Sequence, residues 1–481
     1  MKMVKSLLLG SAAGLVAVAG AQAADLPVKA KAVEYVKVCS LYGAGFYYIP
    51  GTDTCIKIGG FVRTEWDHNA NGSFAPMLDG TNALYTRDGN TLLNRSRGIV
   101  TFDTRSQTEF GTLRSYLRAG WQWTSQDATV GGSSSTVYLD RAFIQIAGFT
   151  FGKTQSFFDF FCTGCYSLQT NKLWVDTGGS GTPVFAYTAQ LGNGVTATVS
   201  IEDYTEQRLP IVDANVAVAT LWPAGATQTA RNRGYNIPDV VGNIRVDQAW
   251  GSAQVMGALH NNAANYYTGD NQTAHPDEKW GWAVGAGLTL KMPWSAKDTL
   301  SGHVTYCEGA ARYCSNPSAT LGSGSGFGLV NETDIGVGWI ADAYYNASNT
   351  SSQLELTQAF SAVAAFEHYW TPTLRTSIYG GYFDFEANSA VVDATCGGVA
   401  RVGGGTLSAG CADWSAWQVG SRTLWNPVAN LDVGLDIIYT EVDSALKGAQ
   451  YATTAGLPPT LIINDTHVWS GILRIQRNFW P

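Results

Sequence analysis

The chain has 481 residues and a formal net charge of −8 at pH 7, with 14% charged, 12% aromatic and 45% hydrophobic residues. Ordinary hydrophobicity with so few charges excludes a disordered chain, and the acidic balance argues against a nucleic-acid partner, which needs a basic face. The sequence lacks the runs of about 20 apolar residues that helical membrane proteins require, so we expect a β-rich protein with dispersed apolar residues.

Residues 1–23 have the pattern of a signal peptide. Lys2 and Lys5 form a positively charged start, residues 6–19 are apolar but too short to span a bilayer, and Ala21-Gln22-Ala23 matches a cleavage site. The alternative is an N-terminal membrane anchor. Removal of the segment takes away Lys2 and Lys5 and no acidic residue, so the net charge moves from −8 to −10. We expect an exported bacterial protein.

The eight cysteines suit an oxidising compartment. Eight cysteines allow about 105 pairings, but here they fall into four couples that are close in sequence and flanked by loop-like residues. For Cys162 and Cys165 the alternative is a thioredoxin-like redox pair or half a zinc site, although neither a βαβ pattern nor a second CxxC accompanies them. We expect the disulfides Cys39–Cys55, Cys162–Cys165, Cys307–Cys314 and Cys396–Cys411.

Segments of about ten residues alternate apolar and polar side chains through the rest of the chain. In 57–68, for example, Val62 and Trp66 lie on one face and Glu65 on the other. A period of two predicts a β-strand with two different faces. The predicted strands are 57–68, 94–106, 112–124, 136–147, 149–156, 183–191, 195–203, 241–250, 252–260, 280–292, 299–307, 357–370, 374–384, 413–425, 431–442 and 466–479.

Residues 334–345 also alternate, but we place them inside a long loop. A seventeenth strand would put the two ends of the barrel chain on opposite sides of the membrane, whereas bacterial barrels have an even number of strands.

Short turns alternate with long connections along the chain. Gly192-Asn193-Gly194 is a tight turn, whereas 269–279, 309–332 and 387–412 are long and rich in small polar residues. This asymmetry is typical of outer-membrane barrels, and Trp and Tyr near strand ends resemble interface girdles. A soluble β-sandwich would instead turn its apolar faces inward. We predict an all-β fold, a 16-stranded antiparallel transmembrane β-barrel. The sheet must close into a barrel because lipid offers no hydrogen-bond partner to an unpaired backbone group.

The sequence resembles the alphaproteobacterial general porins, the porin family 2 group. The blocks that carry the resemblance span the mature chain: 32–55 with Cys39-Ser40-Leu41-Tyr42-Gly43, 141–159 with Gly148-Phe149-Thr150-Phe151-Gly152-Lys153, 237–251, 367–372 with Glu367-His368-Tyr369-Trp370-Thr371-Pro372, and 472–479. The resemblance implies a homotrimer of 16-stranded barrels in the outer membrane. It also implies a third extracellular loop that folds inward as a constriction.

Two features depart from the family pattern. Family members usually end on the Phe of the last strand, whereas Trp480 and Pro481 follow Phe479 here. The pair Cys162 and Cys165 looks like an addition to the constriction loop. We divide the chain into three parts: a signal peptide at 1–23, an N-terminal periplasmic or lumen segment with a disulfide hairpin at 24–56, and the barrel domain at 57–481.

Charged residues share one face of the first predicted strands. An arginine facing lipid at the midplane costs about 2–4 kcal/mol, so this face is expected to line the lumen. The third loop, 154–182, should place carboxylates opposite the arginines. The predicted pore residues are Arg63, Arg95, Arg97, Asp103, Arg105, Arg114, Arg118, Asp159 and Asp176. The alternative is that the arginines are only solvated, or hold the loop in place.

Six aromatic residues also lie in the third loop: Phe157, Phe158, Phe160, Phe161, Tyr166 and Trp174. We expect them to pin the loop to the wall, and a stacking track for sugars is the alternative. The net charge of −10 favours cations and the arginines favour anions. Loop carboxylates near the mouth and arginines at the constriction would act in series, and we expect a mild cation preference.

The predicted function is a passive diffusion channel for small hydrophilic solutes and ions across the bacterial outer membrane. Its expected partners are membrane lipid and further copies of itself. No enzyme is expected, because HExxH, GxSxG, Walker A and a GxGxxG in a βαβ setting are absent from the sequence, and no cofactor or metal is implied. The alternatives are a solute-selective porin, a non-conducting surface adhesin or structural barrel, and a soluble β-rich lectin.

Overall fold

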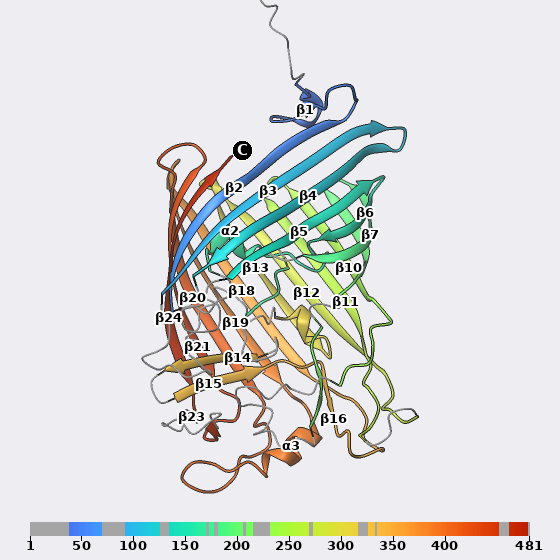
Figure 1. Ribbon diagram of the computed structural model, residues 1–481, viewed down its shortest axis with the longest axis vertical. Helices are drawn as coiled ribbons and strands as arrows, with labels where there is room; N and C mark the ends of the chain where they lie inside the picture. The colour runs from blue at the N-terminus through green and yellow to red at the C-terminus, as the bar shows by residue number, and fades with distance from the viewer. Residues whose placement is uncertain are drawn as a thin grey trace, which may run out of the picture.

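Sixteen antiparallel strands form one closed barrel in the computed structural model of the protein (Figure 1). The structure describes residues 38–69, 92–125, 134–169, 173–177, 181–204, 208–214, 231–268, 273–315, 326–331, 334–451 and 461–479. The barrel strands are β2 (Cys55–His68), β3 (Leu92–Thr108), β4 (Gly111–Thr124), β5 (Ser134–Ile146), β6 (Phe149–Thr154), β7 (Thr182–Gly192), β8 (Val195–Glu202), β10 (Asp239–Gln248), β11 (Gly251–Asn262), β12 (Lys279–Met292), β13 (Ser295–Glu308), β18 (Gln358–Thr371), β19 (Leu374–Glu386), β20 (Trp414–Trp425), β21 (Leu431–Asp443) and β24 (Thr466–Asn478). Each strand pairs with its neighbour along the chain, and β24 pairs with β2 to close the sheet.

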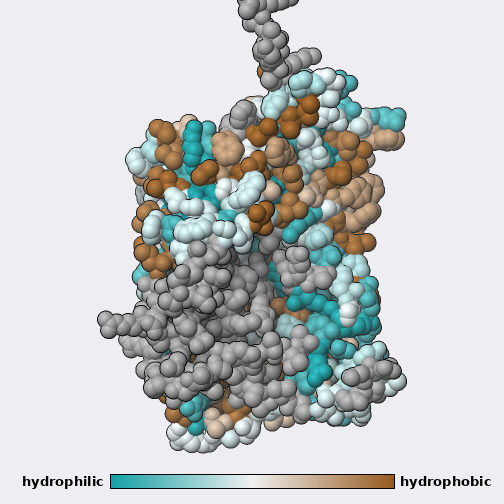
Figure 2. Space-filling view, in the orientation of Figure 1, coloured by the Kyte–Doolittle hydropathy of each residue, from teal (hydrophilic) through white to brown (hydrophobic). Residues whose placement is uncertain are grey.

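The period-two pattern correctly predicted all sixteen strands. On β2, Val62 and Trp66 are 60% and 50% exposed, whereas Glu65 and Asp67 are fully buried. Exposed apolar side chains recur on the outer face of the other strands, and Figure 2 shows them over the upper part of the barrel. This arrangement, with apolar groups outside and charges inside, is that of a barrel in lipid. A soluble sandwich would bury the apolar face instead.

One strand breaks the simple alternation. Opposite Arg118 and Ala119 of β4, the register of β5 shifts, so that Arg141 and Leu139 are the paired residues and Asp140 is the extra one. A β-bulge of this kind reverses the parity of the strand. As a result both Asp140 and Arg141 are buried on the inner side, while Leu139 is 44% exposed.

The short turns and the long connections lie at opposite ends of the barrel (Figure 1). At the short-turn end, β1 (Tyr47–Tyr48) pairs with the start of β2, and the Cys39–Cys55 disulfide closes this hairpin. The signal segment 1–23, residues 24–37, Trp480 and Pro481 lie outside the described residues. Within the described part of the chain, no helix is long and apolar enough to cross a membrane.

The long connections form two small sheets of their own. One contains β14 (Gly326–Asn331), β15 (Asp334–Trp339), β22 (Gln450–Tyr451) and β23 (Leu461–Ile463), and the other contains β9 (Ile211–Asp213), β16 (Ala343–Tyr345) and β17 (Glu355–Leu356). Residues 334–345 therefore belong to a loop, as predicted. These connections also carry the helix α3 (Ala390–Cys396) and the short helix η6 (Ala311–Tyr313).

The loops pack an apolar core against part of the inner barrel wall. Trp339 of β15 is fully buried, and the Trp414 indole of β20 donates a hydrogen bond of 2.9 Å to its carbonyl oxygen. A Cβ on Gly338 would lie 2.2 Å from the Trp414 ring, so only glycine allows this close approach. The same core includes Phe383 and Ile438 of the barrel wall. The loops therefore cover one side of the lumen.

All four expected disulfides form. They join Cys39 to Cys55, Cys162 to Cys165, Cys307 to Cys314 and Cys396 to Cys411. Two of them lie in the loops after β6 and β19, and Cys307–Cys314 joins the end of β13 to the loop that follows it. Sequence proximity was a sufficient guide because each bridge closes a short loop.

Candidate functional site

An arginine wall lines the inner side of β2, β3 and β4. We use this name for Arg63, Arg95, Arg97, Arg105, Arg114 and Arg118. Their faces follow from the alternation, because the intervening Phe102, Leu117 and Trp121 are exposed on the outer side. Strand register then sets the neighbours: Arg63 lies opposite Arg97 across β2 and β3. The predicted grouping of these six residues on one inner wall is present in the structure.

Glu65 ties three strands of this wall together. Its side chain is fully buried, and Arg95 of β3 donates to it with an Nε–Oε2 distance of 2.6 Å. On the other side, Arg474 of β24 donates with an Nε–Oε1 distance of 2.5 Å. Arg63 lies 3.7 Å away on the same strand. One carboxylate thus compensates several guanidinium groups at the seam where the barrel closes.

Two further carboxylates pair with the wall. Asp103 accepts hydrogen bonds from Arg105 at 2.8 Å and from Arg114 at 3.0 Å. The bulge residue Asp140 lies 3.1 Å from Arg118. Arg105, Arg114 and Arg118 therefore each have a carboxylate partner, and their side chains are only partly exposed.

Arg97 differs from its neighbours because its partners are neutral. Its Nε donates to Oε1 of Gln122 at 3.1 Å, and its guanidinium lies 5.4 Å from the centre of the Tyr138 ring. Arg63 likewise donates to Gln476 at 2.7 Å. Within the described residues Arg97 forms no ion pair.

The segment between β6 and β7, residues 155–181, contacts the inner side of the opposite wall. Its first part accepts hydrogen bonds from wall amides: Asn243 of β10 donates to Phe157 O at 2.6 Å and Gln254 of β11 to Asp159 O at 3.2 Å. On β12, a Cβ on Gly287 would lie 2.2 Å from the Phe160 ring. Glycine here makes room for the segment.

The second part of the segment contacts β13, β19, β21 and β24 in turn. The short helix α2 (Thr163–Tyr166) ends in Tyr166, whose hydroxyl lies 3.1 Å from Thr299 and whose carbonyl oxygen accepts from Ser377. Asp436 of β21 then accepts from the Leu168 N–H and, at 3.0 Å, from the Ser167 hydroxyl. Arg474 donates to Leu168 O at 2.6 Å. The contacts follow the wall from β10 round to β24.

The two predicted loop carboxylates have partners inside the segment. Asp159 is 7% exposed and accepts hydrogen bonds from the N–H and the hydroxyl of Thr177. Burial, together with the nearby Asp176, raises the pKa of Asp159 above its ordinary value. Asp176 accepts from the Thr163 N–H at 2.8 Å. Both carboxylates therefore shape the segment, and Asp159 does not face open solvent.

The aromatic residues of the segment pack against the barrel core. Phe158, Phe161 and Trp174 are almost completely buried, and Tyr166 is 7% exposed. Phe161 lies edge-on to His303 of β13 with ring centres 5.9 Å apart. These rings are inaccessible to a solute, which favours the expected pinning role over a sugar-stacking track.

Several inner-wall residues were missed from the sequence. Arg474 and Asp436 lie on the inward faces of β24 and β21, where the alternation of the last two strands could have revealed them. Asp140 and Arg141 depend on the β5 bulge, for which the sequence pattern gave no signal. In the described residues, no group of three or more His, Cys, Asp or Glu side chains is placed to hold a metal ion.

Comparison with known proteins finds outer-membrane channels. A family model described as "Porin subfamily" matches residues 25–472. The chain is similar to "Porin Omp2b" of Brucella suis biovar 1, with 32% identity over 62% of this chain and 83% of the relative. "Porin Omp2a" of Brucella melitensis biotype 1 is 36% identical over 52% of this chain and 64% of the relative, so slightly under two thirds of that protein is spanned. The solved outer membrane channel DcaP of Acinetobacter baumannii superposes with a TM-score of 0.58 over 90% of this chain and 99% of that chain, at 14% identity, which bears on the fold alone.

Proposed function

The chain belongs to the porin subfamily and is a passive diffusion channel of the outer membrane, and we propose that its pore runs between the arginine wall and segment 155–181. The observation that carries this proposal is the course of the segment along β10 to β24. The segment also packs against Leu93 of β3 through Leu168, whereas Arg97, Arg105, Arg114 and Arg118 of the arginine wall remain partly exposed. Solutes would then pass a constriction with arginines on one side and loop backbone on the other, where charge and size sort them.

The remaining assignments come from the sequence pattern and from the exposed outer surface of the barrel. We propose that residues 1–23 are removed on export, that 24–56 form a periplasmic segment at the short-turn mouth, and that 57–481 form the barrel domain. The band of exposed apolar side chains would contact lipid and two further copies in a homotrimer. Transport down a gradient needs no catalytic group, so we propose a channel without enzymatic activity.

Conductance in a planar lipid bilayer tests this function. Detergent-purified protein should give large ohmic steps, often in groups of three, because each barrel of a trimer opens independently. A control for folding is the heat-modifiable mobility of the barrel on gels. Silent membranes with correctly folded protein would contradict an open pore and favour the adhesin alternative. Saturable block by a single solute would favour the solute-selective alternative.

Replacing Arg97 by glutamine should shift the reversal potential under a KCl gradient towards cations. The reason is that Arg97 donates its hydrogen bonds to neutral Gln122 and not to a paired carboxylate, so removal of its charge changes the field that passing ions meet. The matched control is Arg477→Gln, which removes the same charge from an exposed residue at the short-turn end of β24, next to the outward Ile475. Equal reversal potentials for Arg97→Gln and the wild type would refute a pore along this wall.

A further inference from the structure

One disulfide differs from the other three in its exposure. Cys39, Cys55, Cys307, Cys314 and Cys396 are at most 1% exposed. By contrast, the residues of the fourth bridge, Cys162 and Cys165, are both exposed, as is Gly164 between them. A Cβ on Gly164 would meet nothing within 4 Å, so open space lies over this turn.

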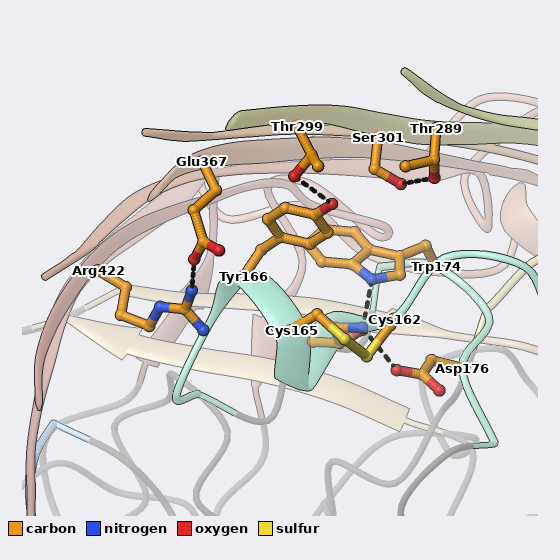
Figure 3. The surroundings of a disulfide bond; sticks show 11 residues. Cys162, Cys165, Tyr166, Trp174, Asp176, Thr289, Thr299, Ser301, Glu367 and Arg422 are labelled. Carbon is orange, nitrogen blue, oxygen red and sulfur yellow. Dashed lines mark hydrogen bonds and ion pairs between the residues drawn. A yellow bond between two sulfur atoms is a disulfide. The ribbon is translucent and has the colours of Figure 1, made fainter. Parts of the chain in front are cut away.

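The exposed disulfide lies on the side of the turn that is directed away from Thr299 and Ser301 of β13 (Figure 3). The opposite side of the same turn is anchored: the Trp174 indole donates to the Thr163 hydroxyl at 2.9 Å, and Tyr166 is held by β13 and β19. The buried residues of the turn therefore face the covered wall. Cys162 and Cys165 lie on the exposed side of the turn.

The disulfide also restrains the exposed side of this turn. Helix α2 has four residues, and its ends are tied by the backbone bonds Cys165 N to Cys162 O at 3.1 Å and Ser167 N to Thr163 O at 2.9 Å. Helices this short are unstable in water without a constraint. The Cys162–Cys165 bond supplies that constraint at the exposed side.

We propose that Cys162–Cys165 is a thiol-exchange site open to the channel, and that small anionic thiols react with it there. This inference rests on the pore position proposed for the segment. The arginine wall lies across the same lumen, and positive potential concentrates anions and lowers the free energy of a thiolate. Arg141 on the inner side of β5, the strand next to β4, interacts electrostatically with Asp176 of the segment.

The reaction is ordinary thiol–disulfide exchange. A reagent thiolate attacks one of the two sulfurs, the S–S bond breaks, and the other sulfur leaves as a thiolate that takes up a proton. A second reagent thiolate then attacks the mixed disulfide and releases the other cysteine. The two electrons come from two reagent thiols, which leave as one oxidised disulfide.

The chemical test compares two thiols of similar size on the folded, detergent-solubilised protein. The anionic reagent is 2-mercaptoethanesulfonate and the cationic reagent is 2-mercaptoethylamine. Released thiols are alkylated and located by mass spectrometry. We expect Cys162 and Cys165 to be alkylated first, with the anionic reagent several-fold faster, and the difference to shrink in Arg97→Gln. Earlier labelling of Cys307 and Cys314, or faster reaction of the cationic reagent, would overturn the proposal.

The electrical test uses the same anionic reagent during bilayer recording. Current fluctuations in the open wild-type channel should rise after addition, because the loosened turn moves within the pore. The double variant Cys162→Ser/Cys165→Ser should show the raised fluctuations from the start and no response. The matched control Cys396→Ser/Cys411→Ser removes another loop disulfide and should respond like the wild type.

The two proposals fail in different ways. In one outcome the wild-type channel conducts and mass spectrometry shows complete exchange, but the current fluctuations stay constant. This outcome would refute the pore-facing site and leave the proposed channel function intact. Silent membranes before any reagent is added would refute the proposed pore, whatever the chemistry of the disulfide.

Discussion

Replacing Asp436 by alanine will raise the single-channel conductance and the size limit for solutes. Asp436 accepts hydrogen bonds from the Leu168 N–H, from the Ser167 hydroxyl and, at 2.7 Å, from the Tyr379 hydroxyl. Hydrogen bonds to a charged group contribute about 1.5–3 kcal/mol each, so alanine removes the charged acceptor that holds Ser167 and Leu168 of segment 155–181 to the wall. The segment should then leave the wall part of the time.

The matched control is Asp432→Ala. Asp432 lies on the same strand and the same face, four residues away, and binds Asn426 and Asn478 rather than the segment. Both variants remove one negative charge from the lumen, so a change in ion preference that both variants share is due to the lost charge and not to movement of the segment. A rise in conductance and in the rate of liposome swelling with large sugars should occur only in Asp436→Ala. Unchanged values in that variant would show that other contacts hold the segment.

The apolar contacts of Leu168 limit how far segment 155–181 can leave the wall in Asp436→Ala. Leu168 is 6% exposed and packs with Leu93, Leu424 and Ile472. Because this cluster remains in Asp436→Ala, we expect fluctuating rather than permanently wide channels. Combining the substitution with Leu168→Ala should make the wide level the dominant one.

Replacing Glu65 by glutamine will destabilise the barrel more than any substitution at the exposed pairs. Arg95 and Arg474, both largely buried, would lose the carboxylate that compensates them. Removal of one partner from a buried ion pair costs about 3–5 kcal/mol, because a buried charge is left unpaired. The affected ion pairs link β2 with β3 and with β24, so the substitution weakens the barrel where β2 and β24 close it.

Asp103→Asn provides the comparison. Its partners Arg105 and Arg114 have side chains that are 28% and 27% exposed, so water can replace the lost carboxylate. Partly hydrated pairs of this kind contribute about 0–1 kcal/mol. The measurement is the temperature at which the compact gel form disappears, compared at one heating rate because barrel unfolding is often irreversible. Equal shifts for the two variants would refute the seam role of Glu65.

The strand positions could be predicted because each depends on local information. The period of two and the short turns specify where a strand crosses the membrane, as on β2 and β12. Charged residues, which are costly in lipid, specify which side of the strand faces the lumen. The arginine wall followed for the same reason. In contrast, the contact of Leu168 with Asp436 joins residues 268 positions apart, and no periodicity encodes such a pairing.

The loop sheets and the β5 bulge escaped prediction for related reasons. β15 pairs in parallel with β23 across more than a hundred residues, and β9 does so with β16. Such pairings depend on where the barrel places the loop ends. The bulge at Asp140 inserts one residue into an otherwise regular alternation, and its effect on Arg141 is visible only in the register. Asp159 was expected at the pore surface, yet its hydrogen bonds to Thr177 bury it.

Closure of β2 against β24 also constrains how the protein is made. The Glu65–Arg474 contact spans 409 residues, so the first barrel strand to be synthesised waits for the last one. Until then the sheet has two open edges that can pair with other chains. Loop-closure entropy makes such distant pairings slow to form. The unfinished chain therefore needs protection from aggregation during export, and a defect in β24 should cause loss of protein before assembly rather than a leaky channel.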